Sequence, residues 1–306
     1  MKDPRLERVL DRDGYLRMPR LALDDLELVR RVYATAPVGP ARETVPASTA
    51  AVDREWLHQM APGEGWRIST DECVPEDRIR LKNEMAPVWE RIADEVFVDH
   101  EVVQSSFLVK HPGPDSVLPL HQDPNVVDEH DYRAVTAWIA LDDITVAVDN
   151  GPMHVLPGSH RAGYEWRGTR TVPTYINDLE ALWAHSIPID VAAGDVLIMD
   201  GRLLHGSPPN RSDRPRGAIA GMFAPRGAPL CHAVSILIDR VEVRRVDADF
   251  FLQTSYRSLR ASVPDEYPVV STAERAESPL TADVLVAQQR YLHSWRGRAR
   301  RWLDLR

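Results

Sequence analysis

Between about residues 101 and 240 the chain consists of short apolar or alternating runs separated by Gly, Pro, Asp and Asn, and this pattern limits the folds available to it. The runs include EVVQSSFLVK, AVTAWIAL, DVLIM, RGAIAGMFA and HAVSILI. Short strands with turn residues between them are typical of antiparallel sandwiches and barrels, whereas βαβ units need intervening helices. No G-x-G-x-x-G, Walker A or G-x-S-x-G motif opens a helix after a strand. The sequence therefore predicts an all-β core and gives no support to a nucleotide-binding or serine hydrolase site.

Helical periodicity flanks this core. Residues 1–35 predict a helix, a short strand at YLRMP and a second helix, and residues 76–97 predict another helix in spite of Pro87. Residues 36–50 are rich in proline and small residues and predict a loop, and the tail after about residue 250 looks helical. We expect one domain over residues 1–306, with a β core at about 100–240, helical support at 1–99 and a helical segment at 241–306.

The charge balance restricts the partners. The chain has 46 acidic and 37 basic side chains, a formal net charge of −9. Such a surface repels polyanions, so we expect no nucleic-acid partner. Arginines do crowd residues 290–306, but they alternate there with aromatic residues, and we expect a terminal helix that packs against the body.

Two cysteines, Cys73 and Cys231, lie far apart and belong to no Cys/His cluster, so neither a disulfide framework nor a structural zinc site is indicated. The charged N-terminus has no apolar run of signal-peptide length, and no stretch approaches the roughly 18 apolar residues of a membrane span. We expect a cytoplasmic protein with no membrane contact.

Among the eleven histidines, only His121 is followed two places later by a carboxylate, Asp123. Residues i and i+2 of an extended strand project from the same face, so this pair could hold one metal ion. A His-x-Asp tripeptide alone is weak, because roughly one is expected by chance in a chain this rich in both residues.

A second segment strengthens the interpretation. A Gly-Asp turn, an apolar strand and then His205 in a polar turn precede another strand that starts near Arg216. Two histidines and one carboxylate form the facial triad that binds non-haem Fe(II) and leaves adjacent positions open. Zinc accepts the same ligands, but a zinc hydrolase needs a general base near the open position, and no HExxH or similar motif supplies one. Iron is therefore favoured.

Taken together, these motifs resemble the phytanoyl-CoA dioxygenase-like family of Fe(II)- and 2-oxoglutarate-dependent oxygenases. The resemblance extends over about residues 100–225, in the order of the family, and the N-terminal DGYLRMPRL looks like its opening strand. It rests on His121-Gln122-Asp123, the strand AVTAWIALDD, the turn NGPMHVLPGSH at 150–160, Gly194-Asp195, and His205-Gly206-Ser207 with Asn210, Ser212 and Arg216.

The resemblance implies a double-stranded β-helix, a cupin-like jelly-roll barrel with iron in its open mouth. It also implies that Arg216, eleven residues after His205, binds the far carboxylate of 2-oxoglutarate. A buried carboxylate needs a charge-assisted partner, and a guanidinium offers a bidentate fork. Ser207 could donate to the same carboxylate, and Gln104 matches a position that touches the co-substrate near the metal.

The resemblance implies hydroxylation of an unactivated C–H bond of a small organic molecule, and we expect this reaction to belong to specialised metabolism, with dioxygen consumed and succinate and CO2 released. Asp123 supports this, since related halogenases carry a small residue in its place. Desaturation, epoxidation and cyclisation by the same class are alternatives, as are a non-catalytic metal-binding jelly roll and a cupin-type hydrolase or isomerase.

Several residues near the ligands are candidates for the substrate pocket: Gln122, Asn125, Trp138 and Trp166. The 161–185 segment, rich in aromatic residues, could form the lid, because loops at a barrel mouth commonly determine specificity. His154 and His160 flank a Gly- and Pro-rich turn, where we expect them to have structural roles.

Overall fold

The computed structural model describes residues 1–37, 65–237, 239–255, 258–259 and 263–278, together with 281, 283 and 285–286. The helices are α1 (Pro4–Asp13), α2 (Leu23–Thr35), α4 (Ser69–Glu72), α5 (Pro75–Val96), α6 (Leu179–His185) and α7 (Phe250–Gln253).

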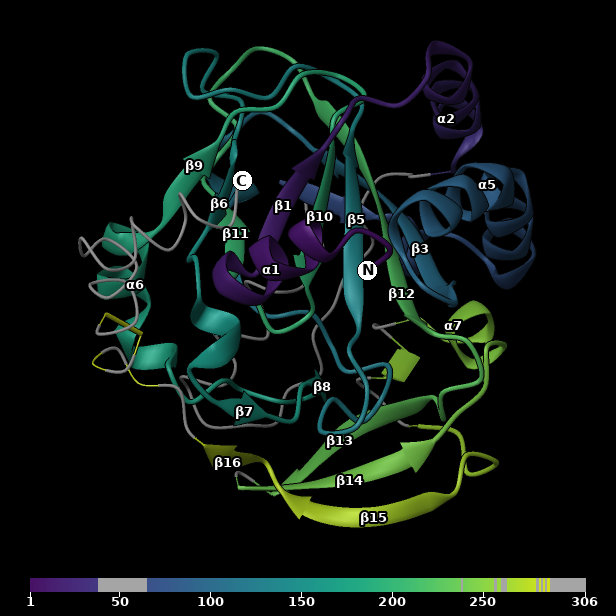
Figure 1. Cartoon of the computed structure of the whole chain (residues 1–306), viewed down its shortest axis with the longest axis vertical. Helices are drawn as coiled ribbons and strands as arrows, with labels where there is room; N and C mark the ends of the chain where they lie inside the picture. Colours follow the sequence, from purple (N-terminus) through teal and green to yellow (C-terminus); the bar gives the residue numbers. More distant parts are fainter. Residues whose placement is uncertain are drawn as a thin grey trace.

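Two antiparallel sheets carry the core (Figure 1). The larger has the strand order β1 (Tyr15–Met18), β10 (Val196–Asp200), β5 (Val135–Ala140), β12 (Arg216–Pro225), β3 (His100–Lys110) and β2 (Trp66–Ile68). The smaller has the order β4 (Leu118–His121), β11 (His205–Ser207), β6 (Met153–Val155) and β9 (Ile187–Ile189).

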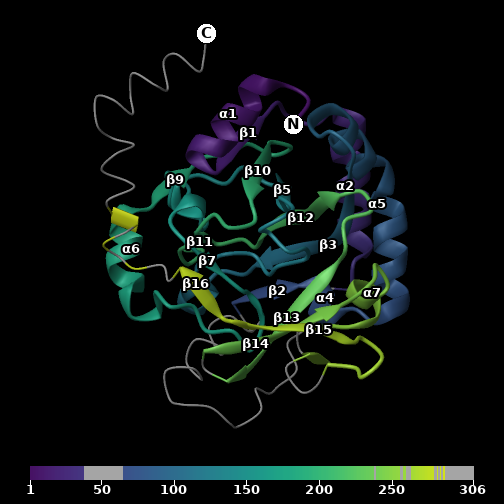
Figure 2. The same cartoon turned by 60° about the horizontal axis from the view of Figure 1, so that its bottom comes forward.

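Every residue of the central strand β5, VTAWIA, is buried, because both faces of the larger sheet are covered. Its outward side chains Ala137 and Ile139 join a core with α2 and α5, whereas Trp138 and Ala140 pack on the inner side with Met153 of the smaller sheet. Figure 2 shows α2 and α5 together on one side of the molecule and α6 on the other. A strand buried on both faces has a nearly continuous apolar sequence, which is how β5 and β10 look. The predicted jelly-roll core with flanking helices is confirmed.

The N-terminal elements begin and end where the sequence indicates. The Asp3 side chain accepts a hydrogen bond from the Arg5 amide at the start of α1, and Gly14, with φ of 82°, ends that helix. Helix α5 continues through Pro87 and buries Met85, Val88, Trp89, Ile92 and Val96.

The structure differs from the sequence prediction at both ends of the chain. The short strand predicted at YLRMP is confirmed as β1, but the helical support expected at 1–99 also supplies β2, and these two strands form the edges of the larger sheet. The prediction of a helical segment after 241 is wrong for its described strands, β14 (Arg240–Arg245), β15 (Val269–Glu274) and β16 (Ala276–Ser278). β15 is exposed along most of its length, so burial imposes little alternation on its sequence. Pairing decides the conformation of these strands: β14 pairs with β13 (Cys231–Leu237), β15 with β14, and β16 with a short strand at Tyr164–Glu165. Most of the predicted 36–50 loop and the whole arginine-rich 290–306 segment lie outside the described residues.

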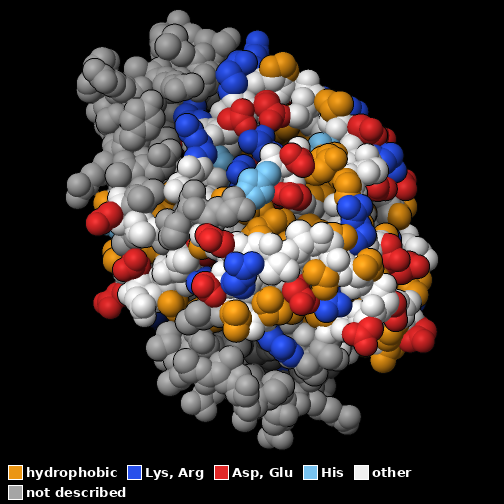
Figure 3. Space-filling view, turned by 90° about the horizontal axis from the view of Figure 1, so that it is seen from below, with side chains coloured by type: hydrophobic (Ala, Val, Ile, Leu, Met, Phe, Trp, Pro, Cys, Tyr) orange, Lys and Arg blue, Asp and Glu red, His pale blue; other side chains and the backbone are white. Residues whose placement is uncertain are grey.

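On the face formed by β13 to β15, acidic and basic side chains are interspersed with apolar ones, and the described residues form no continuous basic surface there (Figure 3). Both cysteines are buried free thiols. Among the described residues, no helix is long and apolar enough to cross a membrane.

Candidate metal centre

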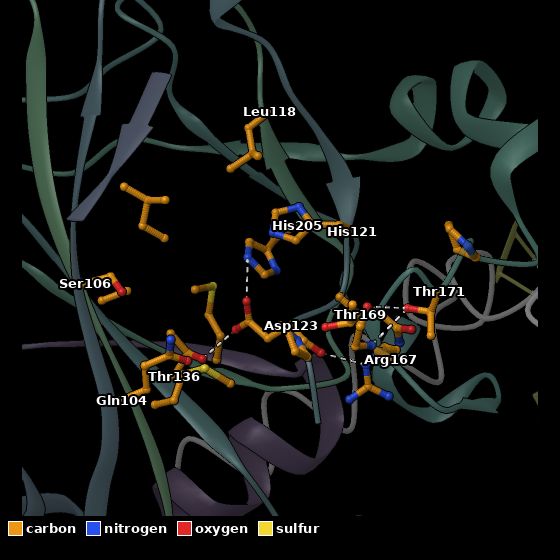
Figure 4. Close-up of a pocket in the computed structure, with 18 of the residues that line it drawn as sticks. Gln104, Ser106, Leu118, His121, Asp123, Thr136, Arg167, Thr169, Thr171 and His205 are labelled. Atoms are coloured by element: carbon orange, nitrogen blue, oxygen red, sulfur yellow. Dashed lines mark hydrogen bonds and ion pairs between the residues drawn. The ribbon is translucent and has the colours of Figure 1, made fainter. Parts of the chain in front are cut away.

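The three predicted ligands meet where the edge strand β4 of the smaller sheet pairs with its neighbour β11. His121 is the last residue of β4, His205 is the first of β11, and the two are direct partners in the antiparallel register. Their rings lie 4.3 Å apart, centroid to centroid. Asp123 follows β4 by two residues, and one potential ligand atom from each residue lies within 4.8 Å of the others. Figure 4 shows the three side chains pointing toward one another.

Both imidazole rings bond to the backbone through Nδ1, so Nε2 is the nitrogen that each ring can offer to a metal. Nδ1 of His121 lies 2.8 Å from the Pro119 carbonyl oxygen, and Nδ1 of His205 lies 3.0 Å from that of Leu203. A carbonyl can only accept, so each Nδ1 carries the proton and donates it, which leaves a lone pair on Nε2. Burial, and then the neighbouring His205, lowers the pKa of His121 to about 4, so this ring is neutral near pH 7.

Gly206 explains how two ligands come so close. A Cβ at this position would lie 2.7 Å from the Leu118 carbonyl oxygen and 2.9 Å from that of Pro119. Because only glycine lacks this atom, β11 can lie against β4 at the point where His205 is placed opposite His121.

The Asp123 carboxylate is oriented by the larger sheet. Thr136 on β5 donates its hydroxyl to Oδ2 at 2.5 Å, while Oδ1 lies 3.7 Å from Nε2 of His205. The threonine therefore occupies one carboxylate oxygen and leaves the other facing the histidines. The sequence analysis did not identify Thr136, since no local pattern links it to a residue thirteen places earlier.

The triad opens onto a cavity of about 230 Å³, lined mainly by apolar and aromatic side chains. Such a lining with a few converging polar groups is typical of small-molecule sites. The 165–173 stretch of the predicted lid forms part of its wall. The candidate residues found in the lining are Gln104, Gln122, Trp138 and Trp166.

Arg216 and Ser207 are not among the residues that line this cavity, although Trp138, which lines it, contacts Arg216. The buried Arg216 guanidinium packs over the Trp138 ring at 5.9 Å and donates to the carbonyls of Gly151 (2.9 Å) and Asn150 (3.4 Å). Burial lowers its pKa to about 10, so it remains a cation. No carboxylate of the described residues forms an ion pair with it.

Lys110, which the sequence analysis missed, is the cross-strand partner of Arg216. Its Nζ donates to the backbone carbonyls of Ser116, Ser207 (3.3 Å) and Pro208 (2.9 Å), while burial, and then the charge of Arg216, lowers its pKa to about 6. The buried Ser207 hydroxyl has no hydrogen-bond partner among the described residues. The Asp142 carboxylate acts on Arg216 only by its charge and forms no ion pair with it among the described residues. A bound carboxylate could therefore pair with the buried guanidinium and satisfy the orphaned hydroxyl.

Asn125 is fully buried outside the cavity lining, and its side-chain oxygen accepts from the Arg167 amide at 2.6 Å. His154 bonds to Ser186, and His160 to the Asp11 carbonyl; neither belongs to the triad. The donor set of the centre is therefore two imidazole nitrogens and one carboxylate oxygen, the set that suits non-haem Fe(II).

Comparison with known proteins connects this geometry to relatives. A family model described as phytanoyl-CoA dioxygenase (PhyH) matches residues 10–218. Phytanoyl-CoA dioxygenase 1 of Oryza sativa subsp. japonica is 31% identical over 128 residues, 39% of this chain and 43% of the relative. The phytanoyl-CoA dioxygenase domain-containing protein 1 of Bos taurus is 32% identical over 125 residues, 38% and 42% of the two chains. The matched region thus spans less than half the length of these relatives.

Among solved structures, the non-heme alpha ketoglutarate dependent carbocyclase SnoK from nogalamycin biosynthesis is similar in fold. It superposes with a TM-score of 0.50 at 23% sequence identity, over 75% of this chain and 86% of that one.

Proposed function

The chain belongs to the phytanoyl-CoA dioxygenase family, and from this membership we propose that it is an Fe(II)- and 2-oxoglutarate-dependent oxygenase that hydroxylates an unactivated C–H bond of a small organic molecule. The observation that carries the proposal is the convergence of His121, Asp123 and His205 at one end of a largely apolar cavity. We place its reaction in specialised metabolism.

In this proposal His121 and His205 bind the metal through Nε2, and Asp123 binds it through Oδ1. The carbonyls behind both rings fix their tautomer, and Thr136 keeps Oδ2 away from the metal. A metal held by these three donors would keep coordination positions free for co-substrate and dioxygen, and all three ligands line the cavity from which these would enter.

Arg216 and Ser207 bind the far carboxylate of 2-oxoglutarate. The guanidinium supplies the charge, and the free hydroxyl supplies a further donor. Gln104, which lines the cavity on β3, contacts the co-substrate nearer the metal.

When bound, the Fe(II) and 2-oxoglutarate pair activates dioxygen, so that one oxygen atom enters the substrate and 2-oxoglutarate is converted into succinate and CO2. The protein's own contribution is orientation. The apolar walls exclude water, and Gln122, Trp166 and the 165–173 stretch place one C–H bond of the substrate beside the triad.

Succinate release tests the proposal. Purified protein supplied with Fe(II), ascorbate and 2-oxoglutarate should release succinate slowly even without its substrate. His121→Ala and Asp123→Ala should abolish the release. His154→Ala is the matched control, because it removes a histidine from the same sheet that bonds to Ser186 rather than facing the triad. Succinate release that survives either ligand substitution would refute the proposal.

A further inference from the structure

Arg167 is a buried arginine at the turn between β7 (Tyr164–Glu165) and β8 (Gly168–Thr169), and it forms part of the cavity wall (Figure 4). Its guanidinium donates in three directions. Nε bonds to the backbone carbonyl of Asp123 at 2.7 Å, Nη1 to that of Glu165 at 2.8 Å, and Nη2 to the carboxylate of Glu129 at 2.6 Å.

The main chain of Arg167 strengthens this connection. Its amide donates to the side-chain oxygen of Asn125 at 2.6 Å, and its carbonyl accepts from the Asn125 amide at 2.9 Å. One residue thus makes three hydrogen bonds to the 123–125 segment, in addition to its bonds to Glu165 and Glu129.

Asp123 needs such support because it lies beyond the end of β4. The strand holds His121 by its ladder hydrogen bonds, but two residues later the ladder has ended. Apart from the bond between the Asp123 amide and the Gly201 carbonyl, at 3.1 Å, the backbone of Asp123 is held by Arg167. A shift of this backbone moves the carboxylate relative to both histidines.

The chemistry of the guanidinium suits this role. A buried ion pair contributes little net stability, because desolvation offsets much of the attraction, but removing one partner leaves the other charge buried and unpaired, which is strongly destabilising. A lysine in the same place could not span the Asp123, Glu165 and Glu129 acceptors, because its single nitrogen lacks the planar fork.

We propose that Arg167 is a positioning residue that fixes Asp123 for metal binding and ties it to the wall of the substrate cavity. The inference rests on the proposed function in that Asp123 is a metal ligand. Through its bonds to the two carbonyls, Arg167 joins the backbone of Asp123 to that of Glu165, which lines the cavity. Loss of Arg167 therefore weakens metal binding even where the fold survives.

Mn(II) affinity, measured by calorimetry on protein shown to be folded, tests the proposal without requiring turnover. Arg167→Met should weaken Mn(II) binding about 10- to 100-fold, the usual cost of removing a group that orients a metal ligand. Because this substitution leaves Glu129 buried and charged, Arg167→Met combined with Glu129→Gln is the variant expected to fold well. It should show the same loss of Mn(II) affinity.

Arg167→Lys keeps a cation beside Glu129, so it tests the proposal if both methionine variants fail to fold. This variant should bind Mn(II) at least about 10-fold more weakly than the wild type. The matched control is Arg244→Met, which removes a partly buried arginine from its pair with Glu242 on β14, away from the triad. This control should lower thermal stability and leave Mn(II) affinity unchanged.

A folded double variant, or a folded Arg167→Lys, with wild-type Mn(II) affinity would overturn the inference and make Arg167 purely structural. A different result would refute the proposed function. Wild-type protein that binds Mn(II) but never converts 2-oxoglutarate would reject the oxygenase assignment, while the comparison of affinities would still decide the role of Arg167.

Discussion

The hydrogen bond from Thr136 to Asp123 offers a clean perturbation of the metal centre. Thr136→Val removes the hydroxyl that donates to Oδ2 at 2.5 Å and puts a methyl group of similar shape in its place. Thr136 is 3% exposed, so water cannot readily replace the lost donor. The Asp123 carboxylate then loses the hydrogen bond that keeps Oδ1 directed at the histidines.

The expected loss follows from the energy of such a bond. A hydrogen bond to a charged group contributes about 1.5–3 kcal/mol. At about 1.4 kcal/mol for each tenfold change in an equilibrium constant, Mn(II) affinity should fall about 10- to 100-fold. The same range is typical of groups that orient metal ligands.

Calorimetric titration with Mn(II) measures this loss directly. Thr136→Ser, which retains the hydroxyl, should stay within about threefold of the wild type, a difference of under 1 kcal/mol. Ser106→Ala is the matched control, since it removes a hydroxyl from the same cavity that makes no contact with the triad. Equal Mn(II) affinity in Thr136→Val and Ser106→Ala, with both proteins folded, would refute the reasoning.

Further outcomes follow from the same structure. Arg216→Gln should raise the dissociation constant of 2-oxoglutarate at least about 30-fold, as expected for a buried charge pair that loses one partner, and calorimetry that finds unchanged affinity would contradict the assigned role. Burial, and then the charge of Arg244, lowers the pKa of His232 from 6.5 to about 4. The unfolded chain therefore binds more protons between these values, so about 3 kcal/mol of stability present above pH 6.5 should be lost as the pH falls through 4. Urea unfolding at pH 7 and 4.5 should show a smaller loss in His232→Gln than in the wild type, and equal losses would count against it. Gly221→Ala should lower the free energy of unfolding by about 1–3 kcal/mol, because the new Cβ would lie 3.1 Å from the Trp89 ring; an unchanged melting temperature would show that the ring can move aside.

Much of the fold could be predicted because strand and helix periodicity are local. The runs around Trp138 and Val196 are nearly continuous because both faces of the larger sheet are buried, and α5 has helical spacing that survives Pro87. The prediction failed after residue 250, where β15 pairs along an exposed surface. In such a strand burial imposes little pattern on the sequence, so the pairing partner decides the conformation.

The site divides in a similar way. The spacing of His121 and Asp123 predicted a metal-binding pair, the strand and turn around His205 added a third candidate ligand, and Arg216 was predicted only through the family resemblance. Thr136 and Arg167 could not, because each acts on Asp123 through one contact made at long range. Threonines and arginines are common, and nothing beside either residue in the sequence distinguishes it from its neighbours.

The sequence by itself determined the kinds of ligand, their order and the type of most elements, since these depend on residue chemistry and on side chains a few positions apart. Only the tertiary structure decided that His205 lies opposite His121, that β1 and β2 form the edges of the larger sheet, and that Arg167 holds Asp123. Strand register and buried hydrogen bonds depend on which faces become covered when distant segments pack together, and this packing depends on the whole sequence rather than on any one segment.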